Sequence, residues 1–281
     1  MEDSIHTAFV GKGEAVKDSE CISFLQWALP RLGLRWRGYR KVRHQVCKRV
    51  DRRIRALGLD GVESYRARLE SVPDEWKALD ELTRITISRF FRERDVFRCL
   101  DETVLPMLRV LAEPGPVEIW SAGCAGGEEA YTLAIAAKRR GISVRIVATD
   151  WDPQQLRRAR EARYAPGTLK DLPATWRSSA FERQGEELVL REELRESVEL
   201  LRQDIRTDMP NGPFHLVLCR YLAFTYFDAP LQRRIAQQLL ERTVPGGFIV
   251  LGKHESWPPE VPGVTELHSG LPIYRGHAAP P

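Results

Sequence analysis

Two acidic residues follow a glycine-rich turn, and a third acidic residue ends the next apolar segment. The turn spans Gly123 to Gly127 within VEIWSAGCAGGEEAY, and Glu128 and Glu129 come directly after it. Asp150 closes the apolar segment RIVATD. Small residues in such a turn let backbone N–H groups approach a ligand, and an acid after the second strand can accept hydrogen bonds from ribose hydroxyls. This spacing predicts the first half of a nucleotide-binding α/β sheet.

The spacing of the glycines narrows the kind of nucleotide. The pyrophosphate-binding pattern G-x-G-x-x-G is not present, because the glycines are Gly123, Gly126 and Gly127. This departure points to an adenosine ligand without phosphates, of which S-adenosylmethionine is the commonest. Glu128 and Glu129 can also have a purely structural role, because acidic side chains in the first turn of a helix interact favourably with the helix dipole.

Strands alternate with helices through the second part of the chain. The pattern predicts strands at 117–121, 144–149, 198–203, 214–219, 247–251 and 272–275, and helices at 128–139, 153–162 and 229–242. Such alternation implies a parallel sheet whose ligands bind at the carboxyl ends of the strands. Asp150, Asp204 and Cys219-Arg220-Tyr221 lie at such ends. Asp152 before Pro153 supplies the helix cap, which leaves Asp150 for a ligand.

The first part of the chain is helical and unevenly charged. Between Arg31 and Gly58 there are eleven Lys or Arg residues and one acid, Asp51. The apolar positions of this stretch recur at three and four residues, which predicts a helix with one buried stripe and an arginine-rich face over Arg37–Arg55. Such a face suits an anionic partner. It is not interleaved with aromatic residues, so we do not expect nucleic acid.

Changes in composition and a Pro/Gly-rich break predict three segments. We expect a flexible leader at 1–18, a helical domain at 19–112 and an α/β domain at 113–281, with the break at Glu113-Pro114-Gly115-Pro116. The five scattered cysteines include no C-x-x-C pair, which predicts reduced thiols without a disulfide framework or metal site. We expect a cytoplasmic protein without membrane insertion, because no apolar run reaches spanning length.

Taken together, four motifs resemble those of the chemotaxis receptor methyltransferases, the CheR-type protein-glutamate O-methyltransferases. The motifs are T-x-S-x-F-F-R-E (Thr86 to Glu93), W-S-A-G-C-A-G-G-E-E-A-Y (Trp120 to Tyr131), A-T-D-W-D (Ala148 to Asp152) and C-R-Y…Y-F-D (Cys219 to Asp228). The resemblance covers roughly residues 20 to 276. It implies a small all-helical N-terminal domain followed by a Rossmann-like class I methyltransferase domain. It also implies S-adenosylmethionine as cofactor, with S-adenosylhomocysteine as product.

The resemblance further implies functional residues. The catalytic residues would be Arg92 and Tyr226. The cofactor-binding residues would be Thr86, Ser88, Arg92, Ala122, Gly123, Glu128, Asp150, Asp204, Ile205, Arg220 and Tyr221. From the residues alone, Arg92 could cap a helix or hold a carboxylate, either the acceptor's or the cofactor's own.

The resemblance has three departures and one shortened region. Thr86 and Tyr221 stand where the family usually has Asn, with one extra residue before Tyr226, and Asp204 replaces a common Asn. Tyr221 could close over the cofactor or block it. Between the second and third strands, where many relatives carry a receptor-docking β subdomain, only one weak hairpin at 187–191 is expected.

The implied reaction is methyl transfer to a glutamate carboxylate of a receptor signalling helix. From the charge pattern, we expect the arginine-rich face over Arg37–Arg55 to dock this acidic helix. A carboxylate is already ionised at neutral pH, so no general base is required. The chain offers no convincing His or Cys for that role, and Cys124 and Cys219 lack a suitably spaced His. Two alternatives stay open: a carboxylate of a small molecule or of another protein, and a catalytically silent docking module.

Overall fold

A computed structural model describes residues 16–268 and 270–277, and these form two compact units that divide between Ile85 and Thr86. The sequence placed this boundary at 112/113. The structure assigns segment 86–112 to the second unit because its side chains pack there: Leu105 and Leu108 share a core with Val117. Most of the expected leader lies outside the described residues, and the first helix begins at Asp18.

The first unit is helical. Its α-helices are α1 (Asp18–Ala28), α2 (Trp36–Tyr39), α3 (Arg43–Ala56), α4 (Val62–Ser71) and α5 (Pro73–Thr83), with a 3-10 turn at Leu29–Leu32. Helix α3 packs against α1 and α5. Val46, Val50 and Ile54 are its buried residues, which confirms the predicted apolar stripe.

The basic segment differs from the single helix that we expected. It is divided between α2 and α3, with a turn at residues 40–42. Two of its arginines serve the fold: Arg53 pairs with Glu75 at 2.9 Å, and Arg49 donates to the carbonyls of Leu82 and Arg84. The solvent-facing charge is therefore smaller than the sequence count suggested.

The expectation that all thiols are reduced was wrong. Cys21 in α1 and Cys47 in α3 form a disulfide, with their Cα atoms 5.9 Å apart. They are separated by 26 residues, so only the packing of the two helices brings them together. Cys99, Cys124 and Cys219 are free and buried.

The second unit contains a seven-stranded sheet. Its strands are β1 (Val117–Ala122), β2 (Val144–Asp150), β6 (Val198–Arg202), β7 (Phe214–Leu218), β8 (Thr243–Val250), β9 (Val264–Glu266) and β10 (Ile273–Gly276). The order is β6-β2-β1-β7-β8-β10-β9, parallel except for β10. The predicted fold class is confirmed. The order reverses between β1 and β7, so the ligand crevice of such a sheet lies beyond the carboxyl ends of these two strands.

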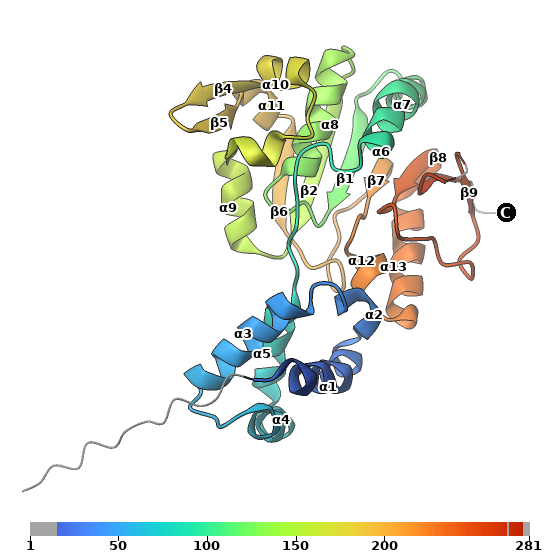
Figure 1. Cartoon of the computed structure of the whole chain (residues 1–281). Coiled ribbons are helices and arrows are strands. Elements are labelled where there is room, and N and C mark those ends of the chain that lie inside the picture. The colour runs from blue at the N-terminus through green and yellow to red at the C-terminus, as the bar shows by residue number, and fades with distance from the viewer. Residues whose placement is uncertain (1–15, 269, 278–281) are drawn as a thin grey trace, which may run out of the picture. The chain divides into compact units, whose positions relative to one another are not determined.

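Helices connect these strands and cover the sheet (Figure 1). Helix α8 (Glu128–Arg139) and α9 (Pro153–Glu161) contact β2, whereas α13 (Ala229–Glu241) contacts β8. Asp152 caps α9 as predicted, its side chain accepting from the N–H of Gln154. Before β1 lie α6 (Arg94–Cys99), a π-helical turn (Leu100–Val104) and α7 (Leu105–Ala112).

The region between β2 and β6 is more structured than the single weak hairpin that we expected. A three-stranded antiparallel sheet, ordered β3-β5-β4, is formed by β3 (Arg163–Tyr164), β4 (Phe181–Gln184) and β5 (Glu187–Leu190). It is accompanied by a 3-10 turn (Pro166–Leu169), α10 (Ala174–Ala180) and α11 (Glu192–Arg195). Strand β3 has only two residues, which is too short to show the alternation of apolar and polar residues that predicts a strand.

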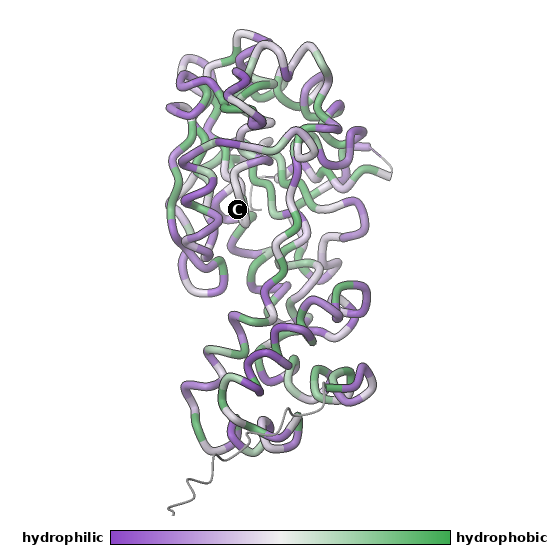
Figure 2. The backbone as a smooth tube through the Cα atoms, turned by 60° about the vertical axis from the view of Figure 1, so that its left-hand side comes forward, coloured by the Kyte–Doolittle hydropathy of each residue, from purple (hydrophilic) through white to green (hydrophobic). Residues whose placement is uncertain are grey.

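Hydrophobic stretches run along the strands inside the larger unit, and hydrophilic stretches cover its outer helices (Figure 2). Trp120, Ile119 and Val217 are completely buried in neighbouring strands. Among the described residues, no helix combines the length and apolar character needed to cross a membrane.

Candidate functional site

The glycine turn that follows β1 adopts conformations that require glycine. Gly123 and Gly127 have φ of 76° and 84°, which L side chains rarely adopt. Space is limited as well: a Cβ on Gly123 would come within 2.9 Å of Leu222, and one on Gly127 within 2.6 Å of the Tyr131 ring. The turn is thus a tight backbone cradle between β1 and α8.

Asp150 has a structural task that the sequence did not reveal. One carboxylate oxygen accepts the N–H of Ala125 at 2.9 Å, and the other accepts the N–H of Asp152 at 2.9 Å. The sequence left Asp150 without the capping role of Asp152, and the structure shows that it holds two backbone N–H groups of the turn and the next segment. Asp150 shapes the cradle and lies beside it.

Glu128 and Glu129, which open α8, have different environments. Glu128 is completely buried: its Oε1 accepts from Arg158 at 2.5 Å, and its Oε2 has no hydrogen-bond partner among the described residues. An orphaned buried carboxylate oxygen at the cradle is a place where a ligand donor is needed. Glu129 accepts from the Ser121 hydroxyl at 2.7 Å and from Arg220 at 2.9 Å.

Arg220 is the centre of a buried ion cluster. Its side chain is 3% exposed, and it donates to Glu93 and Glu129, each at 2.9 Å, and to the backbone carbonyl of Arg92 at 2.8 Å. Burial acts to lower the pKa of Arg220, but the charge of Glu129 and the bond to Glu93 outweigh it and leave the pKa raised. Arg220 therefore joins three segments that are distant in the sequence.

Arg92 and the two predicted tyrosines lie close together. The Arg92 guanidinium carbon is 4.0 Å from the centre of the Tyr221 ring. Burial raises the pKa of Tyr226 to about 12, against the opposing influence of the Arg92 charge. Tyr226 belongs to a short helix, α12 (Ala223–Tyr226), which the sequence analysis missed.

The other predicted residues occupy the same edge of the sheet or the segment before α6. Ala122 ends β1 and is buried, as is Ile205. Both oxygens of Asp204 accept from Arg206, at 2.7 to 3.2 Å. Thr86 and Ser88 are half-buried on either side of the exposed Ile87.

Glu255 is a site residue that the sequence analysis missed. It follows β8, and its buried carboxylate accepts from the N–H groups of Tyr221 and Gly252, at 2.8 and 2.7 Å, and from the Thr225 hydroxyl at 2.5 Å. Its position after a strand, in GKHESW, was an available signal. Glu93, which accepts from Tyr221, Arg220 and the N–H of Lys253, was missed as well.

Glu255 should make stability depend on pH. Burial raises its pKa above the ordinary 4.5. An acid whose folded pKa is raised contributes stability fully below its unfolded pKa, and this contribution is lost as the pH rises through the folded pKa. Glu255→Gln removes the titration and keeps the shape, so the melting temperature of wild type relative to the variant should fall as the pH rises from about 4.5 to 7. A difference that stays constant over this interval would contradict the assignment.

The buried thiols near the turn do not supply a nucleophile. Burial raises the pKa of both the Cys124 and Cys219 thiols far above neutrality. Only a thiolate is strongly nucleophilic, so neither sulfur is activated at pH 7. This agrees with the rejection of a thiol mechanism from the sequence.

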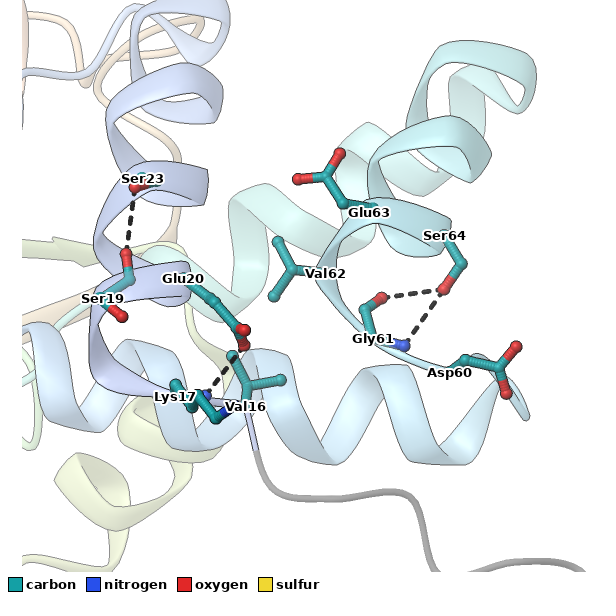
Figure 3. A pocket seen from close by; sticks show the side chains of 10 residues that line it. All are labelled: Val16, Lys17, Ser19, Glu20, Ser23, Asp60, Gly61, Val62, Glu63 and Ser64. Carbon is teal, nitrogen blue, oxygen red and sulfur yellow. Dashed lines mark hydrogen bonds between the residues drawn. The ribbon is translucent and has the colours of Figure 1, made fainter.

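A separate cavity of about 640 Å³ lies in the first unit, between the starts of α1 and α4 (Figure 3). Acidic and hydroxyl side chains line much of it, and two of the hydroxyls form hydrogen bonds to nearby backbone carbonyls. Ser23 donates to the carbonyl of Ser19, and Ser64 donates to that of Gly61. None of the predicted site residues lines this cavity.

Comparisons with known proteins agree with this geometry. A family model described as the CheR methyltransferase, SAM binding domain, matches residues 86–270. A chemotaxis protein methyltransferase of Listeria monocytogenes is 34% identical over 63% of this chain and 69% of its own length. One from Salmonella typhimurium is 31% identical over 76% of each chain.

Two further comparisons are more distant or partial. An uncharacterized 104.1 kDa protein of Rhodobacter capsulatus is 31% identical over 75% of this chain, which spans 23% of that protein. Among solved structures, the plantazolicin methyltransferase BpumL is 14% identical, with a TM-score of 0.35 over 57% of this chain and 48% of its own.

Proposed function

Because the chain belongs to the CheR methyltransferase family, we propose that it methylates a glutamate side chain of a chemoreceptor-like protein to form a methyl ester. It is an S-adenosylmethionine-dependent methyltransferase. The observation that carries the acceptor class is the similarity to chemotaxis protein methyltransferases at 31–34% identity. In the site itself, the proximity of Arg92 to two tyrosines supports transfer to a carboxylate without a protein base.

The residues around the cradle fit the cofactor. The adenosine of the cofactor would lie against the glycine turn, and Asp150 would accept hydrogen bonds from its ribose hydroxyls. The Oε2 atom of Glu128 would accept a hydrogen bond from another N–H or O–H group of the cofactor. The cofactor would also contact the backbone of Gly123 and the apolar side chains of Ala122 and Ile205. Bound there, the cofactor supplies a methyl group activated by its sulfonium.

Other residues of the set would bind the polar end of the cofactor and shape the transfer site. We assign Arg92 to the carboxylate of the cofactor's amino-acid part, because its fork can donate two parallel hydrogen bonds. Thr86 and Ser88, six and four residues earlier, supply hydroxyls in the same segment. Tyr226 would shape the transfer site and exclude water from it.

The roles of Arg220, Tyr221 and Asp204 are less direct than the resemblance implied. Arg220 is bound to two carboxylates, and Asp204 to Arg206, so both would act mainly by placing their loops. Methyl transfer to an ionised glutamate needs no proton removal. The work of the chain is then to align the acceptor oxygen and keep the site dry.

Part of the basic segment is suited to an acidic helical partner. We call Lys41, Lys48 and Arg52 the basic surface: they are exposed around α3 and form no ion pair among the described residues. A receptor helix that carries methyl-accepting glutamates presents the opposite charge. We propose that it docks there, in a cytoplasmic setting.

Docking on the basic surface should depend on salt and on charge. Reversal of all three residues to glutamate should raise KM for a receptor-helix acceptor about tenfold at low salt, with a smaller effect at high salt, because exposed charge attraction is screened. The matched control reverses three exposed charges of the second unit, Arg157, Lys170 and Arg233. A KM that is independent of salt in wild type would exclude this docking mode.

The acceptor can be identified by labelled methyl transfer. The full chain is incubated with methyl-labelled S-adenosylmethionine and lysate of the source cells, and the products are exposed to mild alkali. Alkali-labile label on protein, removed when receptor glutamates are changed to alanine, is expected. Label only in small molecules would move the acceptor to a metabolite, whereas binding of S-adenosylhomocysteine without any transfer would favour a regulatory module.

A further inference from the structure

Tyr221 occupies a backbone conformation that costs energy for its residue type. Its φ is 55°, in the left-handed region that favours glycine and asparagine. Such a conformation persists only when surrounding contacts hold it. Here the N–H of Tyr221 is held by the buried Glu255 carboxylate at 2.8 Å.

The Tyr221 side chain is held at its two ends. The phenol hydroxyl donates to Glu93, which also accepts from Arg220. The ring lies against the backbone of Gly252, since a Cβ added there would come within 2.9 Å of ring carbons. The ring is therefore a fixed platform.

Arg92 rests on this platform. Its guanidinium carbon lies 4.0 Å from the ring centre, and Nη1 donates to the carbonyl of Ile87 at 2.7 Å. Among the described residues, the Arg92 side chain makes no other hydrogen bond, so its remaining guanidinium N–H groups are available for a ligand. Stacking of this kind immobilises the planar fork without using its donors.

We infer that Tyr221 is a positioning residue, which orients Arg92 for the carboxylate of the cofactor's amino-acid part. The inference rests on the role of Arg92 in the proposed function. The sequence left open whether Tyr221 closes over the cofactor or blocks it. In this inference Tyr221 does not block the cofactor, because its ring supports a side chain that binds it. Glu93 and Glu255 fix the platform.

Binding measurements with two probes test this role without any methyl acceptor. S-adenosylhomocysteine carries the amino-acid carboxylate, whereas 5′-methylthioadenosine lacks it. Tyr221→Asn removes the ring and retains a residue that tolerates the backbone conformation. By calorimetry, this variant of the full chain should bind S-adenosylhomocysteine about tenfold more weakly and 5′-methylthioadenosine with unchanged affinity. Tyr221→Phe keeps the ring under Arg92 and loses only the hydrogen bond to Glu93, so it should stay within about threefold of wild type for both probes.

A double-mutant cycle with Arg92→Ala completes the test. If Tyr221 acts through Arg92, Tyr221→Asn should change S-adenosylhomocysteine affinity by less than about twofold in the Arg92→Ala background. Equal weakening of both probes would overturn the inference, as would tighter binding, which marks a blocking residue. These results concern the cofactor alone, so failure to find a glutamate acceptor would contradict the proposed function and leave this test intact.

Discussion

Arg92→Ala should lower kcat/KM for methyl transfer by about 100-fold or more, while the protein remains folded. Two charge-assisted hydrogen bonds to a carboxylate are worth about 1.5–3 kcal/mol each, which accounts for a loss of this size. The structural cost is smaller, because within the described part of the chain the side chain contributes one hydrogen bond, to Ile87, and one cation–π contact, to Tyr221. We expect a loss of about 1–2 kcal/mol in the free energy of unfolding.

Three controls separate the possible roles of Arg92. Arg92→Lys keeps the charge without the planar fork and should recover only part of the activity. Arg89→Ala breaks an ion pair with Asp171 in the same segment and should leave kcat/KM nearly unchanged. If Arg92→Ala binds S-adenosylhomocysteine with unchanged affinity but has a raised KM for the acceptor, the guanidinium binds the acceptor's carboxylate instead. Activity of Arg92→Ala within about twofold of wild type would show that Arg92 binds neither carboxylate during methyl transfer.

The parts of this fold that were predictable from the sequence depend on local signals. Helix α8 has the predicted bounds because the glycine turn fixes its start, and Asp152-Pro153 similarly fixes the start of α9. The strands of the large sheet are short apolar runs between turns, and their predicted positions agree with the structure within a few residues. Alternation of strands and helices was enough to predict the sheet edge that carries the site.

The missing parts depend on contacts between distant residues. Arg220 meets Glu93 and Glu129 across 127 and 91 positions, and no local pattern announces such a cluster. The same contacts explain the domain boundary, because the segment at Arg92 and Glu93 is tied to the second unit through Arg220. The Cys21–Cys47 disulfide likewise depends on helix packing, which cysteine spacing could not reveal.

The ion cluster around Arg220 leads to the largest expected effect on stability. Arg220→Met should lower the free energy of unfolding by about 3–5 kcal/mol at pH 7, because Glu93 and Glu129, whose side chains are only 12% and 13% exposed, would lose their buried cation. Urea denaturation monitored by circular dichroism measures this loss. Arg94→Met is the matched control: its ion pair with Asp171 has a 62% exposed arginine, and breaking it should cost less than about 1 kcal/mol.

A second variant distinguishes an unpaired charge from lost packing. Adding Glu129→Gln to Arg220→Met should recover part of the loss at pH 7, because it removes one of the carboxylates left without a cation. No recovery in the double variant would mean that Arg220 stabilises the fold by packing against Phe97, whose ring centre lies 5.0 Å from the guanidinium carbon, and not through its charge.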